Sequence, residues 1–183
     1  MTHRIALLRG INVGRAKRIA MADLRGLFED LGFTNVRTLL NSGNVVFQAT
    51  RRSNSQVVST LEAAISSQFG FAVPVVILSG NALNSIVAEN PLPNADSDPV
   101  KLLVAFVNST SALSSAKVLL KEQWAPEALA VGTKAAYLWC ANGIIQSSVA
   151  KAFSRATGEA ATMRNWATVL KLQRAVGTAP TAD

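Results

Sequence analysis

The sequence predicts an α+β fold built from two ferredoxin-like (α/β plait) halves, the second modified with a C-terminal helix in place of the last strand. Short apolar runs of strand length alternate with segments whose apolar residues recur at helical spacing. This alternation follows the order β-α-β-β-α-β over residues 4–78, and most of it recurs after residue 100. Prolines and turn-forming residues cluster between the two, at 90–99. We therefore expect a first half at 1–90 and a second half at 91–183.

Each element of the first half has its own local signal. Apolar residues at 24, 27, 28 and 31 have helical spacing, and Gly32 stands where that helix should end. Two short apolar runs around an Asn/Ser/Gly turn predict a β-hairpin. The expected order is a strand at 4–9, a loop at 10–20, a helix at 21–31, strands at 36–40 and 45–48 around a turn at 41–44, a helix capped by Ser53 or Asn54 and closed by Gly70, and a strand at 73–78.

The second half repeats this order up to its last element. We expect a connecting helix at 81–89, a strand at 102–107, a helix at 111–123, strands at 128–131 and 135–140, and helices at 149–157 and 163–176. No final strand is expected, and residues 178–183 should form a frayed tail. The strand at 73–78 should lie at a sheet edge, where it pairs across the halves or across a dimer. The oligomeric state stays open.

The composition favours a basic, cytoplasmic protein. Cys140 is the single cysteine, which excludes an internal disulfide framework. The longest apolar runs have strand length, far short of the ~20 residues that span a bilayer, and the first of them is interrupted by Arg9. The net charge of +7 favours an anionic partner such as a nucleic acid, a nucleotide or a phosphorylated metabolite. Alternatively, a net charge of this size would only keep a small domain soluble.

Four motifs lie in order along the chain. They are LRGINVG at 8–14, MADLR at 21–25, SGNVVF at 42–47, and RNW at 164–166 followed by TV at 168–169 and KL at 171–172. In these motifs the sequence resembles the bacterial domain-of-unknown-function family 1697 over nearly its whole length. The resemblance implies a duplicated ferredoxin-like fold and no established activity. It departs in one loop, where the family often has two glycines and this chain has Gly14 followed by Arg15.

The end of the first strand is the strongest candidate for a ligand site. In a ferredoxin-like sheet the loop at 9–18 and the turn at 41–44 should be neighbours, because the first two strands run parallel. The helix starting near Met21 points its N-terminus to the same edge, and its free N–H groups and dipole favour an anion. No acidic residue occurs from 1 to 22. The candidate ligand-binding residues are Arg9, Asn12, Lys17, Ser42 and Asn44, and Arg15 and Arg18 add positive charge beside them.

The same residues also fit a purely structural interpretation. The glycines at 10, 14 and 43 would supply positive φ in turns, and Asn12 and Asn44 would bond their own backbone. Arg9 would pair with Asp23 or Glu29. The glycines match neither a GxGxxG fingerprint nor a Walker sequence. Both interpretations stay open at this point.

A second candidate comprises Arg164 and Asn165, near the start of the last predicted helix. They would bind a ligand in the groove between the halves, with Ser148 and Lys151 close in sequence. The alternative is a clasp that holds the halves together. Trp166, with apolar residues at 169, 170 and 172, fits a core position better than a ligand platform.

The chemistry of an enzyme is not visible. His3 is the only histidine and the carboxylates are scattered, so we can name no catalytic residue, expect no metal or cofactor, and leave enzymatic activity open. One hypothesis is a binder of, or enzyme on, a small phosphorylated or carboxylated ligand, with Arg9 and Lys17 as clamps. The other is a non-catalytic nucleic-acid-binding module. Nucleic-acid binding by the sheet would need aromatic residues on the central strands to stack on the bases, and Phe47 is the only one on these predicted strands.

Overall fold

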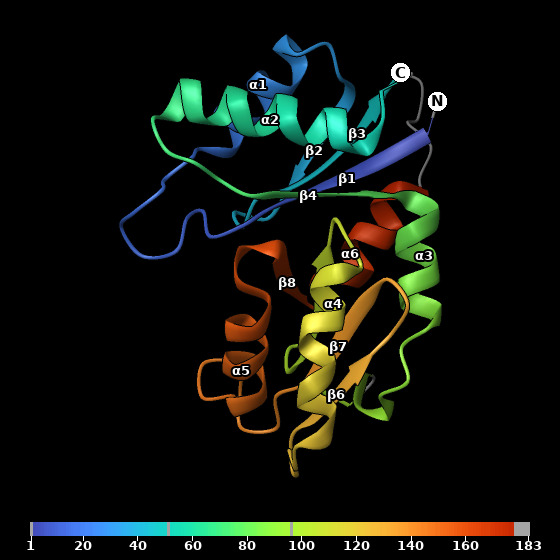
Figure 1. The fold of residues 1–183 in the computed structure, drawn as a ribbon. Coiled ribbons are helices and arrows are strands. Elements are labelled where there is room, and N and C mark those ends of the chain that lie inside the picture. Colours follow the sequence, from blue (N-terminus) through green and yellow to red (C-terminus); the bar gives the residue numbers. More distant parts are fainter. Residues whose placement is uncertain (1, 51, 96, 178–183) are drawn as a thin grey trace. The chain divides into compact units, whose positions relative to one another are not determined.

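The structure is a computed structural model, and it describes residues 2–50, 52–95 and 97–177. The described chain divides into two compact units (Figure 1). The first unit comprises residues 2–81 together with 172–177, and the second comprises residues 82–171. Residues 178–183, expected to form a frayed tail, lie outside the described residues.

The first unit follows the predicted order of elements. They are β1 (Thr2–Leu8), α1 (Met21–Asp30), β2 (Thr34–Leu39), β3 (Asn44–Ala49), α2 (Asn54–Phe69) and β4 (Val75–Ser79). The four strands form an antiparallel sheet in the order β2-β3-β1-β4, so β4 lies at the edge as expected. Ser53 caps α2 with a complete capping box, and Gly70 ends that helix in the left-handed conformation at φ 78°.

Both helices of the first unit pack on one face of its sheet (Figure 1). The core beneath them contains three aromatic rings that pack together. The ring centroid of Phe47, on β3, lies 5.2 Å from that of Phe28 and 4.9 Å from that of Phe33. Phe47 is fully buried. Residues of the opposite face, such as Ile5 and Leu7, are buried as well. The sheet is therefore apolar on both faces, which agrees with the unbroken apolar runs of its central strands.

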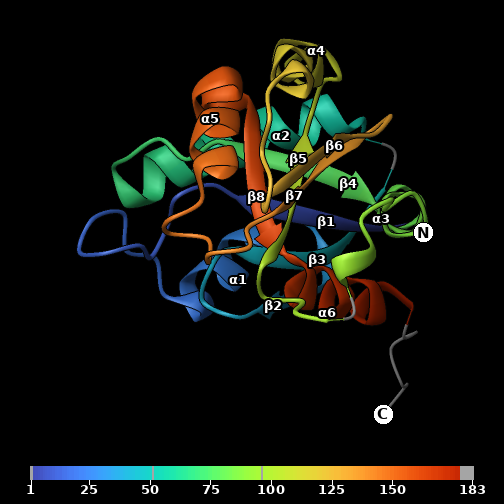
Figure 2. The ribbon, with the colours of Figure 1, turned by 90° about the horizontal axis from the view of Figure 1, so that it is seen from below.

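The second unit repeats the arrangement of strands. Its elements, with the two helices that the units share, are α3 (Gly80–Ala88), the 3₁₀ turn η1 (Pro93–Ala95), β5 (Leu102–Val107), α4 (Ser111–Ala116), η2 (Lys117–Lys121), β6 (Ala128–Val131), β7 (Ala135–Trp139), α5 (Ser148–Thr157), η3 (Gly158–Ala160), β8 (Ala161–Asn165) and α6 (Trp166–Gly177). The sheet order β6-β7-β5-β8 matches that of the first unit. Figure 2 shows α4 and α5 on one side of this sheet, where they cover its core.

The prediction that the second half lacks a final strand was wrong. Residues 161–165 form β8, which pairs with β5 from Leu103↔Asn165 to Val107↔Ala161. The predicted helix at 163–176 therefore begins only at Trp166, and it follows the strand instead of replacing it. The segment ATMRN has few apolar residues, so its pairing with β5 decides its conformation and its composition does not. The predicted helix at 111–123 likewise shortens to α4 and the 3₁₀ turn η2.

Across residues 2–50, 52–95 and 97–177, no helix has the length and apolar character needed to cross a membrane.

Candidate functional site

The loop after β1 and the turn between β2 and β3 are neighbours, as the topology predicted. The Leu8 N–H donates to the Gly43 carbonyl at 2.8 Å, and Leu7 stands opposite Asn44 in the sheet. The side-chain amide of Asn12 donates to the Asn41 carbonyl at 2.8 Å. We call this surface, residues 9–20 and 40–44, the loop–turn edge.

Asn12 holds the loop in one shape. Its Nδ2 also donates to the Ile19 carbonyl at 2.9 Å, and its Oδ1 accepts from the Ile19 N–H at 2.9 Å. Its backbone N–H donates to the Lys17 carbonyl at 3.1 Å. The residue has a φ of 56°, which asparagine adopts more readily than most residues. The side chain is thus occupied by the backbone, as the structural interpretation expected.

Gly43 brings the turn close to the end of β1. Its φ is 74°, and a Cβ at this position would lie 2.7 Å from the Leu8 Cβ and 2.8 Å from the Ile11 Cδ1. Real Cβ atoms do not approach so closely, so a side chain here would push the turn away from β1. Glycine is therefore required for both the conformation and the packing.

Asn44 and Ser42 form hydrogen bonds within the turn. Asn44 is completely buried at the start of β3. Its Nδ2 donates to the Leu39 carbonyl and to the Ser42 Oγ, both at 2.9 Å. These polar groups close the hairpin, as expected for Asx side chains in turns.

The basic side chains of the loop differ in their surroundings. The Lys17 Nζ donates to the Ala72 carbonyl at 2.9 Å, and the Arg18 Nη1 donates to the Gly14 carbonyl at 3.2 Å. Both side chains, and that of Arg15, are exposed. Arg9 is partly buried, and its backbone N–H donates to the Pro74 carbonyl at 2.9 Å. Because these acceptors are neutral backbone carbonyls, they do not neutralise the charges of Lys17 and Arg18. The loop therefore carries a positive potential.

Left-handed backbone conformations gather at the same edge. Four non-glycine residues in the described part of the chain have positive φ, and Asn12, Lys17 and Leu40 are three of them. Leu40, at φ 58°, is 47% exposed. Residues held in such conformations concentrate at functional sites.

Arg164 and Asn165, the second candidate, belong to the second unit and have structural bonds. Arg164 is buried on β8, where its Nη1 donates to the Thr162 Oγ1 at 3.0 Å and to the Met163 carbonyl at 2.8 Å. Burial lowers the pKa of this guanidinium to about 10. The Asn165 Oδ1 accepts from the Thr168 N–H at 2.9 Å and so caps α6. Trp166 is buried, as its spacing predicted.

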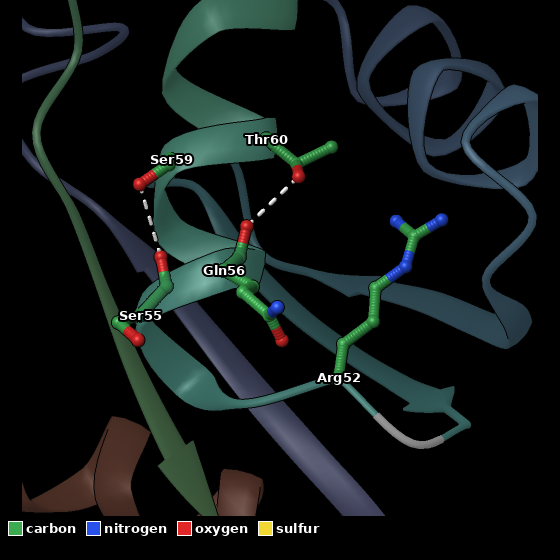
Figure 3. A pocket seen from close by; sticks show the side chains of 5 residues that line it. All are labelled: Arg52, Ser55, Gln56, Ser59 and Thr60. Atoms are coloured by element: carbon green, nitrogen blue, oxygen red, sulfur yellow. Dashed lines mark hydrogen bonds between the residues drawn. The ribbon is translucent and has the colours of Figure 1, made fainter.

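Sequence reasoning missed a shallow, open hollow of about 450 Å³ beside α2 (Figure 3). The Ser59 Oγ donates to the Ser55 carbonyl at 3.1 Å, and the Thr60 Oγ1 donates to the Gln56 carbonyl at 2.8 Å. Arg52 is the charged residue that lines this hollow, and its guanidinium carbon lies 5.7 Å from the centroid of the Phe33 ring. The hydroxyl-rich face of α2 was the only available signal, and such faces are common on solvated helices.

A buried carboxylate in the second unit was also missed. The Glu127 Oε2 accepts from the N–H groups of Ser148 and Val149, at 3.0 and 3.1 Å, at the start of α5. Nearby Cys140 is fully buried, and burial, the largest effect, raises the pKa of its thiol. Nothing local in the sequence indicates the role of Glu127, because its partners lie more than twenty residues away in the chain.

Comparison with known proteins gives the family. The model of the family described as "Protein of unknown function (DUF1697)" matches residues 1–137, and the chain therefore belongs to this family. The match includes the first three motifs and ends before the fourth, at 164–172. The family description assigns no activity. No curated protein matches the chain.

A solved structure supports the fold. It is described as that of a conserved bacterial protein from Streptococcus pneumoniae, and it superposes with a TM-score of 0.78 at 23% sequence identity. The alignment covers 96% of this chain and 98% of that one. The likeness therefore extends over both units and concerns the fold alone.

Proposed function

We propose that this protein binds a small ligand carrying a phosphate or a carboxylate at the loop–turn edge. The observation that carries the proposal is the set of exposed cations Arg15, Lys17 and Arg18 on a loop whose shape is fixed by Asn12. The first 22 residues contain five Lys or Arg and no Asp or Glu. An anion arriving here meets no competing carboxylate from this stretch, and Arg can bind its oxygens in a bidentate manner.

Preorganisation supports binding at this edge. A loop that must become ordered around a ligand loses affinity to conformational entropy. Here the Asn12 side chain already joins the loop to itself at Ile19 and to the turn at Asn41. The cations consequently project from a defined backbone, and the ordering cost falls mainly on their side chains.

The start of α1 adds a second source of positive potential. Ala20, at the N-cap, has an extended backbone and no side-chain group that could accept from the first turn. The N–H groups at a helix start favour an anion, alone or with the helix dipole. Asp23 in the first turn offsets part of this potential, so the loop cations carry most of the proposed affinity.

The remaining candidates take supporting roles in this proposal. Arg9 lies at the base of the loop, where it would act as a clamp with Lys17. Asn12, Ser42 and Asn44 have backbone or neighbouring side-chain partners, so they would shape the edge instead of touching the ligand. Arg164 and Asn165 would stabilise the second unit and the start of α6.

Nucleic-acid binding is less well supported. The sheet-face mode of RNA recognition stacks bases on exposed aromatic rings. Phe47 is buried between Phe28 and Phe33, and β1 has no Phe, Tyr or Trp. Only electrostatic contact with the loop would remain, and such binding weakens steeply as salt rises.

We also infer that each half is a ferredoxin-like plait, with the boundary between the two sequence repeats near residue 90, after α3, whereas the compact units divide at residue 81 and the first of them includes residues 172–177. The shared strand orders β2-β3-β1-β4 and β6-β7-β5-β8, with two helices covering one face of each sheet, support this inference. A cytoplasmic, bacterial origin agrees with the single free cysteine, Cys140, and with the relative from Streptococcus.

The decisive experiment is a thermal-shift and calorimetric screen of phosphate esters, nucleotides, small carboxylates and short oligonucleotides at two salt concentrations. A hundredfold excess over the Kd stabilises the folded state by about 2.7 kcal/mol. Arg15→Ala should weaken a small-molecule hit about tenfold or more, because charge-assisted bonds are worth ~1.5–3 kcal/mol. Arg155→Ala, which removes an exposed arginine of α5, is the matched control and should change nothing.

Each outcome bears on the proposal. A hit that Arg15→Ala and Arg9→Ala weaken, and that survives moderate salt, supports it. Binding of oligonucleotides alone, lost at higher salt, would replace it with generic nucleic-acid binding. A screen without any hit, or a hit that Arg155→Ala weakens equally, would contradict it.

A further inference from the structure

We infer that the ligand of the loop–turn edge carries a small apolar group beside its anionic group, and that Val13 and Leu40 contact that apolar group. The inference rests on the proposed function and goes further, because it names the chemical class of ligand as an alkyl or aryl phosphate or carboxylate. Three observations support it.

The first observation is the exposure of apolar side chains at this edge. Val13 is 73% exposed and Leu40 is 47% exposed. Among the described residues of the first unit, no other large apolar side chain is exposed. Single exposed apolar residues are ordinary on protein surfaces. Here the two exposed large apolar residues among the described residues of the first unit both lie on the loop–turn edge.

The second observation is that one hydrogen bond joins the loop that carries Val13 to the turn that carries Leu40. The Asn12 Nδ2 donates to the Asn41 carbonyl at 2.8 Å. Val13 directly follows Asn12 in the chain, and Leu40 directly precedes Asn41. Consecutive Cα atoms are only ~3.8 Å apart. Val13 and Leu40 therefore flank this hydrogen bond on the loop–turn edge, which also carries Arg15, Lys17 and Arg18.

The third observation is the backbone conformation of Leu40. Its φ of 58° lies in the left-handed region, which is unfavourable for a leucine and readily adopted by glycine or asparagine. The side chain is 47% exposed, so burial compensates for the strain only in part. Strain of this kind at a half-exposed leucine points to function.

Together these features describe an amphipathic ligand. A sugar phosphate or inorganic phosphate would leave both apolar side chains in water. A short alkyl or aryl group would cover them while its anion reached the loop cations. Two apolar side chains can cover only one small group, so we assign a small soluble amphiphile as the ligand of this surface. The lipids of an anionic membrane also combine a phosphate with an apolar group, and vesicles therefore form a separate arm of the test.

The test compares inorganic phosphate, methyl phosphate, phenyl phosphate and hexyl phosphate by calorimetry, below the micelle concentration of the last. Each methylene removed from water contributes a factor of about four in affinity. We expect phenyl and hexyl phosphate to bind about tenfold more tightly than methyl phosphate, which is the gain from removing about two methylene groups from water, because the two side chains cover only part of each apolar group. Leu40→Asn and Val13→Ser should remove this gain and leave the binding of inorganic phosphate unchanged.

The controls separate this inference from a loss of folding. Asparagine tolerates the backbone of residue 40, so Leu40→Asn should unfold at the same temperature as the wild type or higher. Ile145→Ser removes an 84% exposed apolar side chain from the second unit and should keep the full gain. Vesicles of neutral and anionic phospholipid complete the comparison.

The outcomes distinguish the two proposals. Binding of phosphate with no gain from an alkyl or aryl group would overturn this inference and leave the proposed function standing. No binding of any phosphate or carboxylate would overturn both. A gain that persists in the Leu40→Asn, Val13→Ser double variant would also refute the inference. Capture by anionic vesicles without affinity for soluble esters would refute it in favour of a membrane surface.

Discussion

The side-chain amide of Asn12 donates to the backbone carbonyl of Asn41 across 2.8 Å, and this bond joins the loop after β1 to the turn before β3. The same amide makes two bonds with the backbone of Ile19. One residue therefore fixes both the internal shape of the basic loop and its position against the sheet. The proposed ligand site depends on this arrangement more than on any single charge.

Replacement of Asn12 should loosen the loop and lower the stability of the first unit. Asn12→Gly keeps the positive φ and loses three side-chain hydrogen bonds, so we expect a loss of roughly 1–3 kcal/mol. Asn12→Ala should cost about 1–2 kcal/mol more, because alanine is strained at φ 56°. Urea denaturation measures both. Equal stabilities of the two variants would contradict the role of the backbone conformation.

Gly43→Ala should be more disruptive than an ordinary glycine substitution. The new Cβ would lie 2.7 Å from the Leu8 Cβ in addition to the strain of φ 74°. We expect a loss of about 2–4 kcal/mol, of which roughly 1–2 kcal/mol is conformational strain. Gly10→Ala is the matched control, because Gly10 has φ 69° and open space where its Cβ would lie. A similar loss in both variants, measured by thermal or urea unfolding, would show that the close packing of Gly43 is unimportant.

Local signals in the sequence were sufficient for several elements and for the location of the edge. The apolar run of β5 and the cap of α2 at Ser53 lie where they were expected. The adjacency of the loop and the turn followed from strand order. The roles of Asn12 and Asn44 stayed open, because an asparagine that bonds the backbone and one that bonds a ligand look alike in sequence.

Features that depend on distant partners could not be predicted. β8 is mixed in polarity, and its register against β5 makes it a strand. The left-handed conformation of Leu40 has no local signal, since leucine rarely adopts it. Glu127 caps a helix that starts more than twenty residues later, so its role appears only after folding.

Tyr137 should make the second unit sensitive to alkaline pH. Burial, with a smaller contribution from the charge of Glu89, raises the pKa of its hydroxyl from 10.0 to about 12. The folded state therefore keeps the proton that the unfolded state loses above pH 10, and stability falls between pH 10 and 12. The expected fall is about 1 kcal/mol per pH unit.

Tyr137→Phe provides the comparison for this pH dependence. It removes the hydrogen bond to the Ile86 carbonyl, at 2.6 Å, and should cost ~1 kcal/mol at neutral pH. All other ionisable groups are the same in both proteins, so the difference between the two stability curves isolates the tyrosine. That difference should shrink and reverse sign as the pH approaches 12. Parallel curves throughout would rule out a shifted tyrosine.

Glu127 should be necessary for the start of α5. Its Oε2 satisfies the N–H groups of Ser148 and Val149, and the carboxylate lies at the positive end of the helix dipole. Glu127→Ala leaves both donors without this partner and opens a cavity, so we expect a loss of about 2–4 kcal/mol. Glu127→Gln keeps an acceptor oxygen without the charge and should lose roughly half as much.

Hydrogen exchange locates this effect within the second unit. In Glu127→Ala, the amides of residues 148–150 should lose protection more than those of β5, because the damage is local to the helix start. Ser147→Ala is a matched control, since the Ser147 Oγ accepts from the Ala150 N–H of the same helix start, at 3.1 Å, and its loss should cost ~1 kcal/mol. If Glu127→Ala were no more harmful than Ser147→Ala, the buried carboxylate would not be the principal cap of α5.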